Sequence, residues 1–197
     1  KRDITLQAGA RIDVSAHTYG QSIVGLVEWA PLNARAGFEM RNVRYVYDNP
    51  DMSNSFAAAF QLEGLPGTFA EVSVPLSSVS QTAVLELANV SSENNEVVVA
   101  IHAEDGSVKK EVSLRMAPFA TYHLIADEIL RQEDGSGSAG LAIVKSNNQK
   151  ALLATAMHYA RNSDGSIAYM YGIDARESLG AVLSGSYNTF LTQKSIL

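Results

Sequence analysis

Hydrophobic and polar positions alternate along most of the chain, and a period of two is typical of β-strands. In residues 96–114, two alternating runs, EVVVAIHA and VKKEVSL, flank the Asp-Gly pair at 105–106. In residues 154–173, two further runs flank a second Asp-Gly pair at 164–165. Because an Asp-Gly pair between alternating runs is a strong hairpin signal, both stretches are predicted β-hairpins.

Shorter patterns extend the β-rich prediction to other parts of the chain. Residues 3–16 place a Gly turn between ITL and IDV, and residues 82–101 place a polar Ser-Glu-Asn turn between two apolar runs. Residues 65–81 contain two prolines, which cannot donate ladder hydrogen bonds, so this stretch is predicted to be a junction. Helix is expected only in short pieces, at 123–132 and 175–183.

Similar segments recur at a spacing of about 112 residues, which predicts an internal duplication. The matching positions are Leu6 and Leu114, Gly25-Leu26 and Gly140-Leu141, Tyr47 and Tyr159, and the segments 81–87 and 193–197. Short strands separated by frequent turns are typical of sandwiches or barrels. We therefore predict an all-β fold of two related β-sandwich-like units, 1–78 (partial or permuted) and 79–197, with one or two short helices.

Composition restricts the function classes that remain. Hydrophobic residues make up 46% of the chain, which is enough for a core, and the formal charge is −6 with a pI near 5.2. This charge argues against a general affinity for nucleic acids or anionic membranes. No apolar run of about 18 residues is present, so no membrane insertion is expected.

Several kinds of chemistry lack the residues they need. The chain has no cysteine, which excludes disulfides, thiolate metal sites and cysteine nucleophiles, and which fits a cytosolic protein as well as an exported bacterial one. Neither GxGxxG nor GxxxxGK[ST] occurs, so no nucleotide cofactor is expected. The histidines His17, His102, His123 and His158 do not have the close spacing of a zinc site.

Serine hydrolase chemistry is a weak alternative. Residues 183–191 hold serines in a glycine-containing turn, and His158 and Asp174 are candidates for the base and its partner. The segment lacks GxSxG and the strand, sharp turn and helix that accompany it. We therefore predict that the protein is not an enzyme.

Two groups of residues are candidate binding sites. Asp48, Asp51 and Asn54 lie in YDNPDMSN and offer oxygen ligands for a hard cation such as calcium, although an ordinary Asx- and Pro-containing turn has the same composition. Trp29, Tyr169 and Tyr171 are candidates for stacking on a sugar ring. Tyr169 and Tyr171 share one face of a strand, which suits a glycan platform or half of a core.

Residues 85–124 contain an Asn-ended strand, a polar turn, a valine-rich strand, a Gly turn and a Pro-containing loop. This stretch resembles the tandem β-sandwich units, immunoglobulin-like or fibronectin-like, of secreted and surface-anchored bacterial proteins. The resemblance implies an extracellular stalk or scaffold, and it carries no catalytic residue.

The patterns and the resemblance together predict an extracellular or cell-surface bacterial segment that is structural or adhesive. The alternative is a carbohydrate-binding module of a degradative enzyme, with the serine hydrolase as a third hypothesis. Expected partners are proteins, or further copies of the chain pairing through sheet edges at 3–6 and 194–197, and possibly a glycan. No nucleic-acid partner is expected.

Overall fold

The computed structural model describes residues 3–20, 25–32, 37–47, 56–64, 70–148 and 151–177. Its elements are, in chain order, η1 (Ala16–Tyr19), β1 (Arg41–Tyr47), β2 (Phe56–Glu63), β3 (Glu71–Ser77), β4 (Thr82–Asn89), β5 (Asn95–Ala103), β6 (Val108–Met116), β7 (Thr121–Ile125), α1 (Asp127–Leu130), β8 (Ala139–Ser146), β9 (Leu152–Arg161) and β10 (Ile167–Asp174). Among these residues, no helix has the length and apolar character needed to cross a bilayer.

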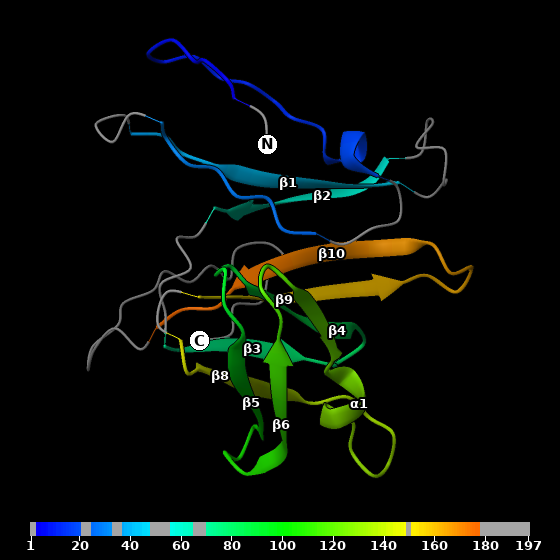
Figure 1. Ribbon diagram of the computed structural model, residues 1–197. Coiled ribbons are helices and arrows are strands. Elements are labelled where there is room, and N and C mark those ends of the chain that lie inside the picture. Colours follow the sequence, from blue (N-terminus) through cyan, green and yellow to red (C-terminus); the bar gives the residue numbers. More distant parts are fainter. Residues whose placement is uncertain are drawn as a thin grey trace.

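The strands form three antiparallel sheets, which confirms the all-β prediction (Figure 1). Two four-stranded sheets, with the orders β10-β9-β4-β7 and β3-β8-β5-β6, enclose a common core. The third sheet is the hairpin β1-β2, which lies beside β10 on the side away from the second sheet (Figure 1). The described part of the chain is therefore a β-sandwich with an additional hairpin layer.

Alternation along the central strands builds the core. Leu85 and Leu87 of β4 point inward from one sheet, and Val97, Val99 and Ile101 of β5 point inward from the other. Each of these side chains is at most 1% exposed. Burying one such side chain contributes about 1.5–3 kcal/mol, so this alternation supplies much of the stability of the sandwich.

Both predicted Asp-Gly hairpins are confirmed. They join β5 to β6 and β9 to β10 in antiparallel register. The polar turn in 82–101 instead crosses between the sheets, because β4 and β5 belong to different ones. The buried side chain of Asn89 fixes this crossover, since its Nδ2 donates to the carbonyls of Glu93 at 2.7 Å and Ala117 at 2.9 Å.

Three local predictions were wrong or only partly right. Residues 7–10 make the expected turn, but no strands form on either side of it. The predicted junction contains β3, in which Pro75 is tolerated because β3 is an edge strand. The predicted helix at 123–132 is reduced to α1, because Thr121–Ile125 pairs with β4 as β7.

The second predicted helix, 175–183, lies largely outside the described residues. Its first part is not helical, because Arg176 forms a β-bridge with Ser73. The bridge extends the chain beyond β10 along the edge of β3.

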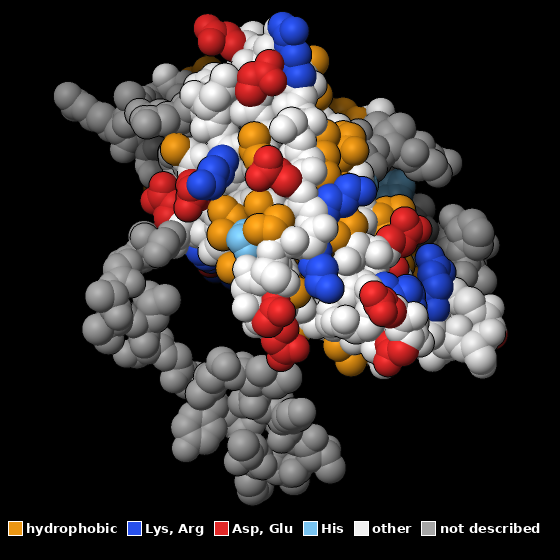
Figure 2. All heavy atoms as spheres, turned by 90° about the horizontal axis from the view of Figure 1, so that it is seen from below, with side chains coloured by type: hydrophobic (Ala, Val, Ile, Leu, Met, Phe, Trp, Pro, Cys, Tyr) orange, Lys and Arg blue, Asp and Glu red, His pale blue; other side chains and the backbone are white. Residues whose placement is uncertain are grey.

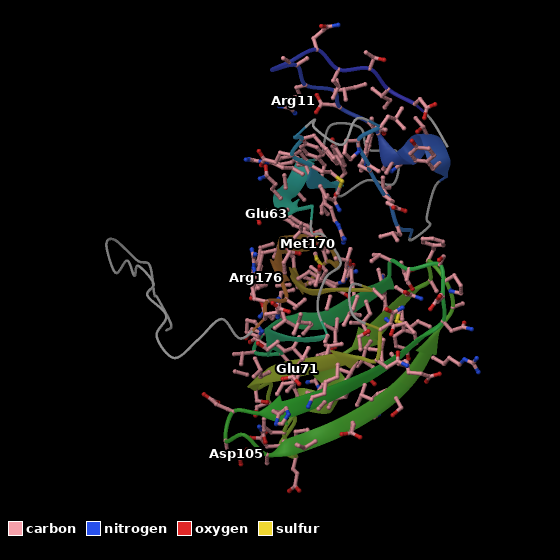
Figure 3. The ribbon with its side chains drawn as sticks, turned by 60° about the vertical axis from the view of Figure 1, so that its left-hand side comes forward. Arg11, Glu63, Glu71, Asp105, Met170 and Arg176 are labelled. Carbon is pink, nitrogen blue, oxygen red and sulfur yellow. The ribbon has the colours of Figure 1, made fainter. Side chains whose placement is uncertain are left out.

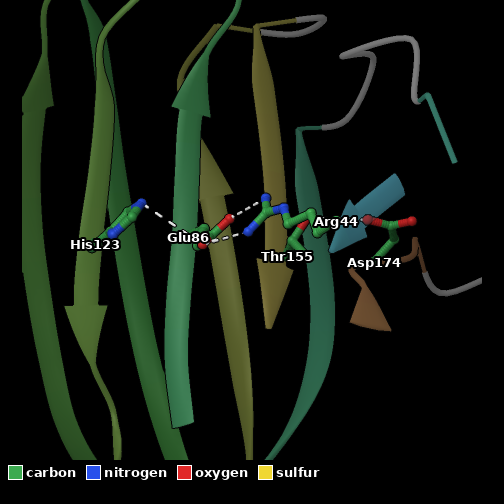
Figure 4. Close-up of polar contacts among 5 residues, drawn as sticks. All are labelled: Arg44, Glu86, His123, Thr155 and Asp174. Atoms are coloured by element: carbon green, nitrogen blue, oxygen red, sulfur yellow. Dashed lines mark hydrogen bonds and ion pairs between the residues drawn. The ribbon is translucent and has the colours of Figure 1, made fainter. Parts of the chain in front are cut away.

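The hairpin β1-β2 is attached to the outer face of the β10-β9-β4-β7 sheet. Arg44 forms two hydrogen bonds with the carboxylate of Glu86, at 2.9 and 2.7 Å, and His123 lies 3.9 Å from the same carboxylate (Figure 4). Leu62 packs closely over Gly172, where a Cβ atom would lie 2.7 Å from the leucine side chain. The absence of a side chain at Gly172 therefore lets β2 approach β10.

A second ion pair lies near the end of the hairpin. Arg176 Nη2 is 3.4 Å from Glu63 Oε2, and Figure 3 shows both residues, with Met170, where the hairpin meets the sandwich. This pair is exposed and contributes little to stability. On the face seen in Figure 2, acidic and basic side chains are interspersed with hydrophobic ones.

The internal duplication is not confirmed, because the described residues contain one sandwich and not two. Leu6 and Leu26 lie outside strands, whereas their predicted counterparts Leu114 and Leu141 lie in β6 and β8. The boundary at residue 78 stays a prediction. The strand before it, β3, pairs with β8 and so belongs to the sandwich.

We predict that Gly140→Ala destabilises the fold by about 1–3 kcal/mol, the usual effect of overpacking a core. A Cβ atom at Gly140 would lie 2.5 Å from the carbonyl oxygen of His102 and 2.5 Å from the Leu130 side chain. Chemical denaturation measures the change. Gly37→Ala is the control, because no atom of the described residues lies within 4 Å of its added Cβ. Equal stability of the two variants would contradict the packing described for β8.

Candidate functional site

The site is built on the outer edge of β3, where alternate backbone groups point away from β8. Ser73 donates its N–H to the carbonyl of Arg176 at 2.8 Å and accepts from the Arg176 N–H at 2.9 Å. Pro75, two residues on, has no N–H to satisfy. Ser77 donates its N–H to Nε2 of His158 at 3.1 Å. Backbone groups that would otherwise be unpaired at a sheet edge are thus satisfied from the opposite sheet.

His158 on β9 is the buried centre of the site. Its side chain faces the core, opposite Ala83 of β4, and the residue is 1% exposed. Because Nε2 accepts from Ser77, the proton of the neutral ring is on Nδ1. Nδ1 is itself buried and has no hydrogen-bond partner among the described residues. Burial lowers the pKa of His158, so the ring is neutral at pH 7.

An aromatic row extends from His158 to the surface. The Tyr171 ring stacks on the imidazole with centroids 4.8 Å apart and planes 13° apart. Tyr169 follows on the same face of β10, 6.4 Å from Tyr171 and within 19° of parallel. Tyr169 is 43% exposed and Tyr171 is 36% exposed, so the row becomes more accessible with distance from the histidine.

Gln81, just before β4, holds the hydroxyl ends of the row. Its Nε2 donates to the Tyr171 hydroxyl at 3.0 Å and to the Ser77 carbonyl at 3.2 Å. Its Oε1 accepts from the Tyr169 hydroxyl at 3.2 Å. One amide therefore fixes both phenols and also satisfies the carbonyl of the β3 edge residue that bonds to His158.

Two roles fit this arrangement. His158 and Gln81 complete the hydrogen bonding of an edge strand, which is a structural role. The ring of Tyr169, immobilised by Gln81 and partly exposed at the end of the row, offers an apolar face that can stack on a sugar ring. Stacking on a sugar would use the exposed ring surface, which the structural hydrogen bonds leave accessible, so the two roles are compatible.

The sequence-predicted residues fall in different places. Tyr169 and Tyr171 are brought together, as expected for one strand face. Trp29 is half-buried in the strand-free segment 25–32, and no ring stacking between described residues joins it to the tyrosines. Asp48, Asp51 and Asn54 lie outside the described residues. Within the described ranges, no group of three or more His, Asp or Glu side chains is arranged to hold a metal ion.

His158 and Asp174 do not form the base and acid of a triad. Asp174 pairs with Thr155 and accepts its hydroxyl at 3.0 Å, on the sheet face that carries the hairpin β1-β2. His158 points to the opposite face, into the core. Alternation along β9 forces this separation, because positions 155 and 158 differ by an odd number. The serines of 183–191 lie outside the described residues.

Sequence patterns alone did not identify Gln81 or Ser77 as members of the site. No local signal marks Gln81, because its partners come from β3 and β10. One signal in the sequence marks the β3 edge: Pro75 is typical of an edge strand as well as of the junction predicted for residues 65–81.

Comparisons with known proteins do not assign a family. No family model and no curated protein matches the chain. Among solved structures, the crystal structure of Thermotoga maritima 1070 is similar with a TM-score of 0.44 and 10% sequence identity, over 58% of this chain and 98% of that one. A likeness at this level identifies neither a fold family nor a function.

We predict that His158 makes the protein less stable in weak acid. Since burial lowers its folded-state pKa, the unfolded chain binds more protons below its own value of about 6.5, and the free energy of unfolding falls by up to ~1.4 kcal/mol per pH unit. The contribution of neutral His158 to the free energy of unfolding is fully present above the unfolded-state pKa. It is lost as the pH decreases towards the folded-state pKa. Urea titrations of the wild type and His158→Gln between pH 7.5 and 5 measure the effect. Equal pH dependence in both would refute it.

Proposed function

We propose that the chain is a non-enzymatic, structural or adhesive segment of a tandem β-sandwich array, displayed on or outside a bacterial cell. The observation that carries the proposal is a match between two hairpins, β1-β2 and β9-β10. Their sequences differ at most positions, so the match is one of backbone pairing.

The two hairpins have the same number of paired positions, seven each. A shift of 114 residues carries Tyr45 onto Tyr159, in place of the sequence match of Tyr47 with Tyr159, and a shift of 111 carries Ala59 onto Met170. With these two shifts, each of the seven pairs of β1-β2 falls on a pair of β9-β10. The difference between the shifts lies in the loop, which spans 48–55 in one hairpin and 162–166 in the other.

The hairpins also share an irregularity. A register shift follows Val46 in the first hairpin, and a register shift occurs at the corresponding point, next to Ala160, in the second. Bulges at fixed positions are retained features of related strands. The coincidence supports the hypothesis that β1-β2 is the last hairpin of a preceding unit.

The surfaces of the chain suit an array whose units contact one another or other proteins. The outward face of β1-β2 exposes Val43, Tyr45 and Phe56. The strands β6 and β7 are open edges of the two sheets, where further strands can add. In such an array the sheets provide rigidity, and edges and loops provide the contacts.

Protease treatment of intact producing cells tests this proposal. Arg11 lies in the strand-free segment 3–20, its side chain is 80% exposed and it is a trypsin site, so peptides that end there are expected in the released fraction before lysis. A cytosolic protein followed in parallel is the control and should appear only after lysis. Release of both proteins only after lysis would overturn surface display.

A second candidate, glycan binding, is favoured by the aromatic row of Tyr169 and Tyr171. We predict that the chain binds glycans on an array and that Tyr169→Ala reduces the signal at least tenfold, because it removes an exposed ring from the row. Tyr122→Ala is the matched control, since Tyr122 is a comparably exposed tyrosine on β7, at the opposite edge of the same sheet. Melting curves verify folding. Equal loss in both variants, or no binding to any glycan, would argue against this function.

A further inference from the structure

An open cavity of about 400 Å³ lies at the end of the sandwich, next to Gln81. Its walls come from the turn between β3 and β4, the helix α1, the loop that follows α1, and the end of β9. Two arginines line it, Arg131 after the helix and Arg161 at the end of β9. None of the motifs recognised in the sequence accounts for this cavity.

The two arginines are held by the same kind of turn. Arg131 Nη1 donates to the carbonyl of Gly135 at 2.9 Å, and Arg161 Nη1 donates to the carbonyl of Gly165 at 2.8 Å. Each glycine belongs to an Asp-Gly-Ser sequence and has a positive φ, +83° and +87° respectively. The two guanidinium groups are thus fixed to rigid loops by equivalent bonds, which reduces the entropy lost when they bind an anion.

The same turns are stabilised by their aspartates. In both, the Asp carboxylate accepts from the Ser hydroxyl at 2.6 Å and from the Ser backbone N–H at 2.8–2.9 Å. These hydrogen bonds lower the pKa of Asp134 and Asp164, so both carboxylates stay charged and bonded in weak acid. The turn carboxylates are therefore occupied by their own serines and do not pair with the arginines.

Two of the three charged side chains that line the cavity are arginines, although the whole chain carries −6. Within the described ranges, Arg161 has no ion pair; its guanidinium lies 5.6 Å from the centre of the Tyr159 ring. Arg131 has one ion pair, with Asp127 at 3.8 Å, which is too long for a hydrogen bond. Two cations and one carboxylate therefore face the cavity, and both guanidinium groups retain unused donors.

The remaining walls are polar. Ser80 and Thr82 contribute hydroxyl groups. The Ser78 hydroxyl is bonded to the backbone of Ser138, and the Gln81 amide is bonded to Ser77 and to the two tyrosines. Ser80 adopts a left-handed conformation with φ of 58°, which is uncommon for a residue other than glycine and is often found at binding sites. Gln81 also bonds to Tyr169 and Tyr171, so the cavity and the aromatic row are adjacent through one side chain.

We propose that this cavity binds the carboxylate of an acidic sugar, a uronic acid residue within a polysaccharide. Arg131 and Arg161 bind the carboxylate through paired N–H donors, and the hydroxyls of Ser80 and Thr82 bind the sugar hydroxyls. A neighbouring sugar of the same chain stacks on Tyr169. The hydroxyl groups beside the arginines favour a ligand that carries both a carboxylate and hydroxyl groups, which a uronic acid has and the side chain of an acidic peptide lacks. This inference rests on the glycan-binding function proposed above.

Calorimetry with the intact chain tests the proposal, with tetragalacturonate as the probe and its methyl ester as the uncharged counterpart. Tetragalacturonate is expected to bind, more weakly as salt rises, and the ester is expected to bind at least tenfold more weakly. Arg161→Gln should cost about tenfold in affinity, as expected for a charged hydrogen bond, and Arg161→Lys should recover only part of it. The matched control is Arg115→Gln on β6, an exposed arginine outside the cavity.

One variant separates charge recognition from a general loss of structure. Asp127→Asn removes the carboxylate that competes for Arg131, so tetragalacturonate should bind severalfold more tightly. Equal affinity for the acid and the ester, or an unchanged affinity in Arg161→Gln, would overturn the acidic-sugar site while leaving glycan binding in place. Absence of binding to every glycan, charged or neutral, would overturn both proposals.

Discussion

The candidate site depends on one requirement, which is that the backbone groups along the outer edge of β3 find hydrogen-bond partners. A strand at the edge of a sheet presents unpaired backbone groups at every second residue. Here Ser73 pairs with the backbone of Arg176, Pro75 has no N–H, and Ser77 bonds to His158 and Gln81. The opposite sheet therefore closes the sandwich along this edge by hydrogen bonds that join its two layers.

Closing the edge determines where the aromatic side chains lie. His158 must be buried and neutral to accept from Ser77, and the buried ring supports Tyr171, which in turn lies beside Tyr169. Gln81 bonds to Ser77 and to both tyrosines while also lining the cavity that holds the two arginines. The hydrogen bonds that close the edge thus place the two tyrosine rings, the Gln81 amide and the cavity that holds the arginines side by side at one end of the molecule.

The sequence predicts those features of the fold that depend on residues close together along the chain. Asp-Gly pairs located two hairpins, and alternation in residues 82–101 located β4 and β5. It did not predict that β4 and β5 belong to different sheets, because alternation is the same in either case. Pro75 is the one signal in the sequence for an edge strand at β3. The Asp-Gly-Ser sequence at 134–136 also matches those at 105–107 and 164–166, and all three form the same turn. Gln81 has no such signal, since its partners are distant in sequence.

Amide hydrogen exchange at Ser77 tests the closure of the β3 edge most directly. We expect the Ser73 and Ser77 amides to exchange as slowly as the amides of β3 that point to β8, and His158→Gln to accelerate exchange at Ser77 more than at Ser73. If the Ser77 amide of the wild type exchanges as rapidly as the outward amides of the open edge strand β6, the edge is not closed, and the site built on it is wrong.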